Sequence, residues 1–304
     1  MRHLRVPSAE TQDWLALCRS SNWLLTTAGV VRLEGDFRGI PLAEHAPKEA
    51  DLCWDGHSHI EVEGKGKGPV HWTERLPEEL QELPLDTWPS AYEIQGDVLI
   101  VKLEGPASPH GERIAQAMLE QLPNIRLVCA DEGVKGDFRV RELTVLKSRD
   151  GTEHTRTRVR EHGHLVWVDP AKAYFSTRLS SEREKTRTSI RKLRGDLGRP
   201  LVLADPYAGV GPALPLLFAE PGLIDGCLVG DLNPDAVELL RMNVEYWGSK
   251  RSDGPLKRTE IMCADALLWG ENPTLREQAD VLLVNLPHDS LEHLPTLLPL
   301  LRPG

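Results

Sequence analysis

Long hydrophobic runs are absent from this sequence, and its first residues lack the features of a secretion signal. No apolar stretch approaches the roughly 18 to 20 residues needed to cross a bilayer, and Met-Arg-His-Leu-Arg-Val-Pro does not open a signal peptide. We therefore expect a cytoplasmic protein with no membrane association. The chain has 304 residues, of which 40% are hydrophobic and 27% charged, as in an ordinary soluble protein with room for two domains.

Cysteine is also scarce, and its pattern excludes two classes of protein. The five cysteines are odd in number and widely scattered, so they predict neither a disulfide framework nor a zinc site. No cluster of other metal ligands is visible, and we expect no metal. Nothing in the sequence points to a protein partner, so we expect a monomer. The cysteines are Cys18, Cys53, Cys129, Cys227 and Cys263.

The net charge of −10 conceals a strong asymmetry. Residues 135–199 contain 17 Lys and Arg against 9 Asp and Glu, an excess of +8, so the rest of the chain carries −18. A positive region within an acidic protein is typical of a site for a polyanion such as RNA. A solvated, salt-bridged surface is the alternative explanation.

The order of segments predicts three domains and a linker. Residues 1–55 form an N-terminal α/β module, in which Ser8 caps a helix and strands follow at 29–33 and 37–42. Residues 56–90 are a polar linker, although Ile60 and Val62 allow an edge strand. Residues 91–178 form a middle α/β domain with a helix at about 111–122.

Residues 179–304 alternate strands and helices, which indicates a parallel, doubly wound, Rossmann-like sheet. Strands are expected at 201–205, 226–231, 261–265 and 281–285, with helices at 184–193, 212–219 and 235–246. The segment 249–258 is a polar surface loop.

The run Asp205-Pro-Tyr207-Ala-Gly209-Val-Gly211-Pro follows the first of these strands, at the edge where open α/β sheets bind ligands. The two glycines allow the backbone to approach a ligand closely. A carboxylate at the strand end suits a cationic ligand, and S-adenosylmethionine carries both a sulfonium and an α-amino group.

The next three strands also end in polar residues. Asp231 is placed to accept hydrogen bonds from ribose hydroxyls. Asp265 could accept one from an adenine amino group, and Asn285-Leu-Pro287 could orient a planar base. Each feature alone is weak, because a strand-end Asp is often only a helix cap. Their order predicts a class I S-adenosylmethionine-dependent transferase, with these residues and the 205–211 run in the cofactor pocket.

The same motifs make a resemblance specific. Together with Tyr174-Phe-Ser-Thr-Arg-Leu-Ser-Ser-Glu-Arg183, they resemble the archaeal and eukaryotic tRNA (guanine-N1)-methyltransferases that modify the guanosine 3′ of the anticodon. Leu4-Arg-Val-Pro and Arg139-Val-Arg141 are similar to that family's other two domains. The sequence stops at Gly304, where related catalytic domains continue into two more strands, so we expect C-terminal strands to be missing.

The resemblance implies a chemistry for the site. Methylation of N1 requires a base near N1 and positive charge near O6. Glu182 matches the family's proposed base, an arginine of the 139/141 pair matches the O6-stabilising group, with Arg141 preferred, and Tyr174 helps to shape the pocket. A competing explanation is helix capping, but in a Ser181–Glu184 capping box Glu184 is the capping carboxylate, which leaves Glu182 free.

The resemblance also implies a tRNA partner held by cationic side chains. Arginines 156, 158 and 160 would lie on one face of a strand, and we expect them to contact the anticodon stem. The expected RNA-binding set is Arg156, Arg158, Arg160, Arg178 and Arg183. Two other functions remain open: an aminocarboxypropyltransferase of wyosine-type tRNA modification, and a tRNA-binding protein without catalysis.

Overall fold

The computed structural model describes residues 1–63, 68–136, 138–286 and 289–303, and the chain forms two compact units, Met1–Arg75 and Leu76–Gly304. The first unit is built on an antiparallel sheet of order β2-β3-β1-β4. Its strands are β1 (Arg2–Pro7), β2 (Val31–Arg32), β3 (Phe37–Pro41) and β4 (His59–Glu61). The edge strand suggested by Ile60 is therefore present, whereas β1 was not predicted.

Helix α1 (Thr11–Ser20) packs against this sheet with Leu15 and Cys18 buried. The helix begins two residues later than a cap at Ser8 would place it. Ser8 opens a 3₁₀ turn, and its hydroxyl makes no hydrogen bond among the described residues, so the prediction that Ser8 caps the helix is wrong. Thr11 instead donates its hydroxyl back to the Ser8 carbonyl at 2.9 Å.

Short helical elements connect and follow these strands. The element η2 (Leu52–Trp54) lies between β3 and β4, and η3 (Trp72–Arg75), α2 (Glu78–Gln81) and η4 (Leu85–Thr87) come after β4.

A mixed sheet of order β5-β6-β7-β8 opens the second unit. Its strands are β5 (Tyr92–Gln95), β6 (Val98–Val101), β7 (Leu127–Lys135) and β8 (Val140–Ser148). The 3₁₀ segment η5 (Gly105–His110) leads into helix α3 (Gly111–Gln121), which buries Ile114 and Met118. Its predicted span was correct to within one residue.

The antiparallel hairpin of β9 (Thr157–Glu161) and β10 (His164–Val168) comes next. The short η6 (Thr177–Leu179) then leads into helix α4 (Ser180–Leu197), which ends at Gly198 in the left-handed region.

The sheet formed by the strands after residue 200 is entirely parallel and has the order β13-β12-β11-β14. Its strands are β11 (Leu201–Asp205), β12 (Ile224–Asp231), β13 (Arg258–Cys263) and β14 (Val281–Leu282). Its helical segments are α5 (Leu214–Phe218), α6 (Pro234–Ser249), η7 (Ala266–Glu271), α7 (Ser290–Leu297) and η8 (Leu298–Leu300). The predicted alternation of strands and helices is confirmed.

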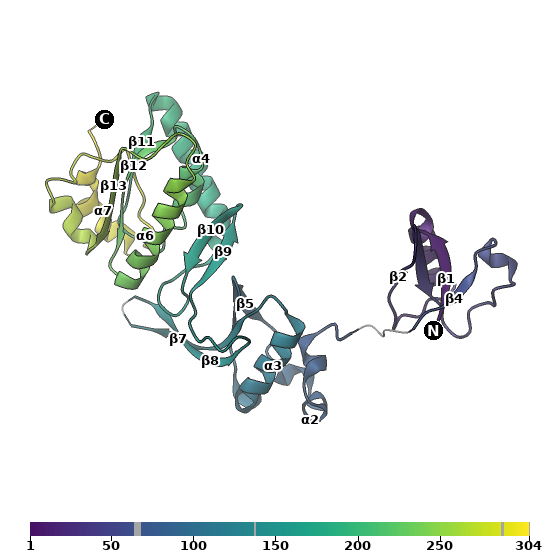
Figure 1. Cartoon of the computed structure of the whole chain (residues 1–304). Coiled ribbons are helices and arrows are strands. Elements are labelled where there is room, and N and C mark those ends of the chain that lie inside the picture. The colour runs from purple at the N-terminus through teal and green to yellow at the C-terminus, as the bar shows by residue number, and fades with distance from the viewer. Residues whose placement is uncertain (64–67, 137, 287–288, 304) are drawn as a thin grey trace. The chain divides into compact units, whose positions relative to one another are not determined.

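Both faces of this sheet are covered (Figure 1). One face packs against α4, α5 and α6 through Leu203, Ile190 and Leu240. The opposite face packs against η7, α7 and η8 around Ala204, Trp269 and Leu297. Because all four strands are parallel, their carboxyl ends meet at one edge, which brings the predicted motif residues together.

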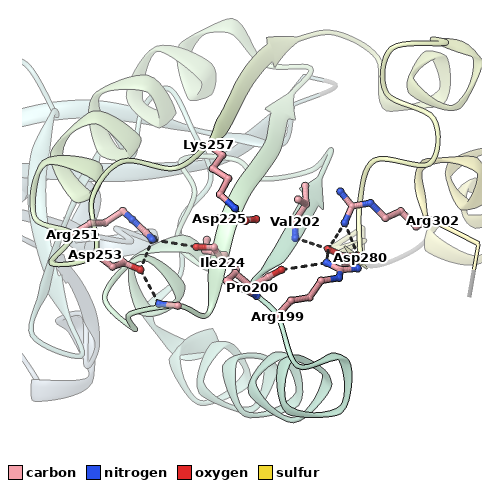
Figure 2. A network of polar contacts seen from close by, with 11 residues as sticks. Arg199, Pro200, Val202, Ile224, Asp225, Arg251, Asp253, Lys257, Asp280 and Arg302 are labelled. Atoms are coloured by element: carbon pink, nitrogen blue, oxygen red, sulfur yellow. Dashed lines mark hydrogen bonds and ion pairs between the residues drawn. The ribbon is translucent and has the colours of Figure 1, made fainter.

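The opposite, amino edge of the sheet is held by ion pairs (Figure 2). The carboxylate of Asp280 is 2% exposed and accepts hydrogen bonds from Arg199, Arg302 and the Val202 amide. Burial opposes ionisation of Asp280, but these donors outweigh it and lower its pKa. The loop after α6 is anchored here too, because Arg251 bonds to Asp253 and to the Ile224 carbonyl.

Candidate active site

The loop after β11 is fixed by three contacts from neighbouring elements. The Gly209 amide donates to the Asp231 carboxylate at 2.9 Å, and the Ala208 amide donates to the Gly230 carbonyl at 2.9 Å. On α6, the fully buried Asn243 donates its side-chain amide to the Val210 carbonyl at 2.8 Å. The loop is therefore held at both ends of its glycine-containing turn.

The two glycines of this loop do different work. Both have a positive φ, 55° at Gly209 and 81° at Gly211, which side chains rarely adopt. A Cβ on Gly211 would lie 2.6 Å from Leu240, so this glycine lets the loop pack on α6. A Cβ on Gly209 would meet nothing closer than the Tyr174 carbonyl at 3.9 Å. Gly209 alone leaves its Cβ side open to a ligand.

Asp205 supplies a buried carboxyl group beside this opening. Asp205 is 4% exposed, and within the described residues its carboxyl group accepts one hydrogen bond, from the Tyr207 amide at 3.3 Å. Burial, together with the nearby charge of Asp231, raises its pKa to about 7, with the Tyr207 amide opposing the shift. A buried carboxyl with so few donors is suited to a cationic group, which would stabilise its ionised form.

The acidic residues at the next two strand ends are already engaged with backbone amides. Each oxygen of Asp231 accepts one amide, from Gly209 and from Asn233, and burial raises its pKa. A carboxylate oxygen has two lone pairs, so both oxygens can still accept from a hydroxyl. Asp265 caps η7 by accepting from the Leu267 amide at 2.9 Å, and it is exposed. Both of the roles weighed for Asp265, helix cap and adenine acceptor, are therefore compatible with its position.

The loop after β11 is also joined to α7. The Tyr207 hydroxyl hydrogen-bonds to Nδ1 of His293 at 2.5 Å, and burial raises the pKa of Tyr207 to about 12. Asn285 lies exposed beyond β14, in the connection that leads to α7. Pro287, the last residue of the predicted base-binding turn, lies outside the described residues.

The segment that precedes α4 is docked against α6 and the residue that caps this helix. The carbonyl of Lys172 accepts from the Asn233 side chain at 2.7 Å, and Asn243 exchanges two hydrogen bonds with the Trp167 backbone. Tyr174, whose carbonyl lies beside Gly209, has a side chain that is 59% exposed. The phenol is thus free to contact a bound molecule next to the glycine opening.

Glu182 lies in the first turn of α4, and the structure corrects the capping argument made about it. The helix begins at Ser180 with no side-chain cap, so Ser181 and Glu184 do not form a capping box. Glu184 pairs with Arg187 instead. Glu182 is exposed and pairs with Lys185 at 2.8 Å.

A groove of about 330 Å³ lies between the first turns of α4 and strand β14. Glu182 lines it together with Ile190, Val281 and Leu283. Asn285 follows Leu283 by two residues, so the segment after β14 leads from this groove to the expected base-binding turn.

Arg141 is connected to the segment before α4 through Glu93, a residue that the sequence did not single out. Its guanidinium donates to Glu93 at 2.6 Å, and Glu93 also accepts from Gln95, which donates to the Phe175 carbonyl at 3.4 Å. Burial favours the neutral form of Glu93, but the bonds from Gln95 and Arg141 and the charges of Arg141 and Arg178 lower its pKa overall.

The other arginine of the pair has a different setting. Arg139 is exposed and has a φ of 51°, and no hydrogen bond from its side chain occurs among the described residues. The contact through Glu93 therefore favours Arg141 over Arg139 as the arginine held near Tyr174.

The basic residues divide into exposed and engaged side chains. Arg158 and Arg160 point outward from β9, as the alternation predicted, while Arg156 pairs with Glu238 at 2.7 Å. Arg178 is exposed. Arg183 is 8% exposed and donates twice to the buried Glu161, so its geometry suits the attachment of α4 rather than contact with a ligand.

In the part of the chain that the structure describes, no helix is long and apolar enough to span a bilayer. Over the same residues, no group of three or more His, Cys, Asp or Glu side chains is arranged to hold a metal ion.

Known proteins share both the sequence and the fold. Residues 72–152 match the TYW2 N-terminal domain, and residues 157–304 match the TRM5/TYW2 methyltransferase domain. The tRNA (guanine(37)-N(1))-methyltransferase Trm5b of Pyrococcus abyssi is 28% identical over 269 residues, covering 86% of this chain and 71% of that protein. Its namesake in Methanocaldococcus jannaschii is 32% identical over 156 residues, covering 51% of this chain and 42% of that protein.

Among solved structures, the complex of aTrm5 with tRNALeu has a TM-score of 0.69 at 21% identity and covers 100% of this chain and 85% of that one. At this level of identity the similarity establishes the fold. With both domain matches and the strand-end motifs, it shows that the chain belongs to the TRM5/TYW2 family and that its C-terminal domain is a class I S-adenosylmethionine-dependent methyltransferase domain.

Proposed function

We propose that this chain transfers the methyl group of S-adenosylmethionine to N1 of the guanosine that lies 3′ of the anticodon in tRNA. The observation that carries the proposal is the convergence on residues 172–183. This segment lies against Gly209 through Tyr174, is linked to Arg141 through Phe175, and carries Glu182 at its end. The names of the relatives support the choice of tRNA and of guanosine 37.

The cofactor pocket is proposed to comprise the loop after β11 and the polar ends of the neighbouring strands. When bound, S-adenosylmethionine supplies an electrophilic methyl group on a sulfonium. Asp205 stabilises the cationic part of the ligand, the open side of Gly209 admits it, and Asp231 accepts from ribose hydroxyls. The remaining pocket residues are Tyr207, Gly211, Asp265, Asn285 and Pro287.

The proposed chemistry on guanine uses two charged side chains. The Glu182 carboxylate accepts the proton of guanine N1, and the N1 lone pair forms the new bond to the methyl carbon as the bond from that carbon to sulfur breaks and its electron pair stays on sulfur. Negative charge develops on O6 as the proton leaves, and the Arg141 guanidinium donates to that oxygen. On binding, Glu182 leaves Lys185 and contacts the guanine, and Arg141 either leaves Glu93 or contacts Glu93 and the guanine together.

The tRNA is proposed to contact the middle and catalytic domains through exposed cations, chiefly Arg158, Arg160 and Arg178. The N-terminal unit is proposed to recognise another part of the tRNA. The domain limits given above, a monomeric state and a cytoplasmic location stay predictions.

The proposal is tested by mass spectrometry of nucleosides from unmodified tRNA incubated with the purified chain and S-adenosylmethionine. One transcript carries guanosine and the other adenosine at position 37. We expect 1-methylguanosine from the first transcript only. A third substrate, tRNA that already carries the wyosine-type precursor, tests the alternative activity that the TYW2 match allows: an aminocarboxypropyl product on it, with no methylation of either transcript, would support that activity. Binding of tRNA without cofactor binding would indicate a protein without catalysis.

A further inference from the structure

A second pocket lies between the β9–β10 hairpin and the helices α5 and α6. Its volume is about 300 Å³. The residues that line it are Arg160, Gly163, His164, Leu165, Pro215, Phe218, Ala219, Tyr246, Trp247, Lys250 and Ser252. None of these described lining residues is acidic, so the pocket combines positive charge with aromatic surface.

The cations of this pocket are available to a ligand. Lys250 is exposed and has no ion pair among the described residues; its ammonium lies 5.8 Å from the centre of the Tyr246 ring. Arg160 is exposed, and within the described ranges its guanidinium donates only to the Gly163 carbonyl, at 3.0 Å. Burial and the charges of His162 and Arg187 lower the pKa of His164, so near neutral pH the pocket's positive charge comes from Arg160 and Lys250.

The floor of the pocket is rigid. Phe218 and Trp247 are 3% and 4% exposed and pack edge to face, with centroids 6.3 Å apart. The indole of Trp247 donates to the Leu165 carbonyl at 2.8 Å, which ties α6 to the hairpin. Tyr246 is partly exposed at the rim and offers a ring face to a planar group.

The charge continues from the pocket along the hairpin. Arg160 pairs in register with Leu165 and Arg158 with Trp167, so all four lie on one face of the two strands. The Arg158 guanidinium lies 5.1 Å from the Trp167 ring centre. A row of cations interleaved with aromatic rings suits a strand of RNA better than a single small anion, because successive phosphates and bases meet successive charges and rings.

We propose that this Arg160–Lys250 pocket binds an RNA strand of the substrate, with a backbone phosphate between the two cations and a base against Tyr246. The proposal rests on the proposed function for the identity of the RNA. The lining of the pocket includes neither Glu182 nor Arg141, so the proposal concerns affinity rather than chemistry.

The test is a titration of an unmodified tRNA transcript with the full chain at several salt concentrations, without cofactor. Lys250→Gln is expected to weaken binding several-fold and to reduce the slope of log affinity against log salt by about one, as expected for loss of one phosphate contact. Arg160→Gln should act in the same way. Lys257→Gln is the matched control, because it removes the same charge from an exposed lysine of the same domain that pairs with Asp225.

The proposal is overturned if the salt slope is unchanged in both Lys250→Gln and Arg160→Gln. It is also overturned if Lys257→Gln reduces the slope as much as they do. Because binding is measured without S-adenosylmethionine, the two proposals fail separately. If the unmodified chain methylates guanosine but Lys250→Gln does not change the salt slope of tRNA binding, only the pocket proposal is wrong. A chain that shows the expected change in slope but transfers no methyl group loses only the proposed function.

Discussion

Arg183 on α4 donates two hydrogen bonds of 2.7 Å to Glu161 on β9, and both side chains are buried. A third bond from the same guanidinium reaches the Ser176 carbonyl. The pair thereby attaches the first turn of α4, which carries Glu182, to the hairpin. A residue expected to bind RNA instead fixes the position of its neighbour.

Breaking this pair should destabilise the fold and misplace Glu182. Glu161→Gln leaves the Arg183 charge buried without a counter-charge, and we expect a loss of about 3 to 5 kcal/mol in the free energy of unfolding. Urea denaturation measures it. Arg113→Gln, which removes one partner of the exposed Glu79 pair, is the control and should change stability by less than about 1 kcal/mol. Equal losses in both variants would contradict this assignment.

The sequence was most informative where local pattern determines structure. Alternating strands and helices predicted the parallel sheet, and the polar residues at strand ends marked its carboxyl edge because parallel strands share that edge. The glycines at 209 and 211 were recognised from their place in the turn. Their different roles depend on Leu240, a residue far along the chain, and only the structure reveals this.

What the sequence did not reveal depends on partners distant in the chain. Glu93 and Asn243 stand in unremarkable positions, and their importance comes from Arg141, Trp167 and the 205–211 loop. The capping-box argument failed for a local reason: η6 leads directly into α4, so Ser181 is already inside the helix. The sequence offered one clue: Asn243 falls at a position of α6 where the helical pattern otherwise places apolar, buried residues.

Glu182→Gln should lower turnover by about 10² to 10⁴, the usual contribution of a general base. Cofactor affinity and stability should be unchanged, because the Glu182 side chain is exposed and, among the described residues, forms an ion pair only with Lys185. Single-turnover methyl transfer and calorimetry separate the two effects. Glu184→Gln, one position beyond the neighbouring arginine, is the control and should retain activity. Full turnover in Glu182→Gln would remove Glu182 from the chemistry.

Glu93→Gln should reduce methyl transfer through Arg141. Loss of the carboxylate removes the nearer of two acidic partners of the guanidinium and leaves Asp131 at 4.0 Å, so we expect kcat to fall about tenfold at unchanged cofactor affinity. In an Arg141→Lys background the same change should cost much less, since coupled residues are not additive. The matched control is Asp97→Asn, which breaks the Arg126 pair in the same sheet. Fully additive effects would show that Glu93 does not act through Arg141.

Cofactor affinity should depend on pH through Asp205. Its pKa of about 7 in the free protein lies above the ordinary value of 3.8, so the carboxyl is largely protonated below pH 7. A bound cation favours the ionised form, and affinity should therefore rise by up to about tenfold per pH unit below pH 7 and level off above it. Calorimetry between pH 5.5 and 8.5 measures this. Asp205→Asn should bind weakly at every pH, and a flat profile in the unmodified chain would assign Asp205 a purely structural role.

The raised pKa of Asp205 and the lowered pKa of Asp280 have opposite effects on how stability changes with pH. An acid whose folded pKa is raised weakens the fold as pH rises from its unfolded value, near 4, through the folded value near 7. Asp205→Asn should therefore gain stability relative to the unmodified chain between pH 5 and 8. For Asp280, whose pKa is lowered, the stabilisation is complete above the unfolded value and is lost as pH falls through the folded one.

Asp280→Asn should then destabilise the protein by about 2 to 3 kcal/mol at pH 7, because Arg199, Arg302 and the Val202 amide all lose a charged acceptor. The difference from the unmodified chain should shrink as pH falls below about 4, where the native carboxyl itself begins to take up a proton. Urea denaturation at several pH values measures both effects. Asp225→Asn, which releases only the exposed Lys257, is the control. A penalty for Asp280→Asn that stays constant down to pH 3 would mean that packing, rather than the ion pairs drawn in Figure 2, holds the amino edge of the sheet.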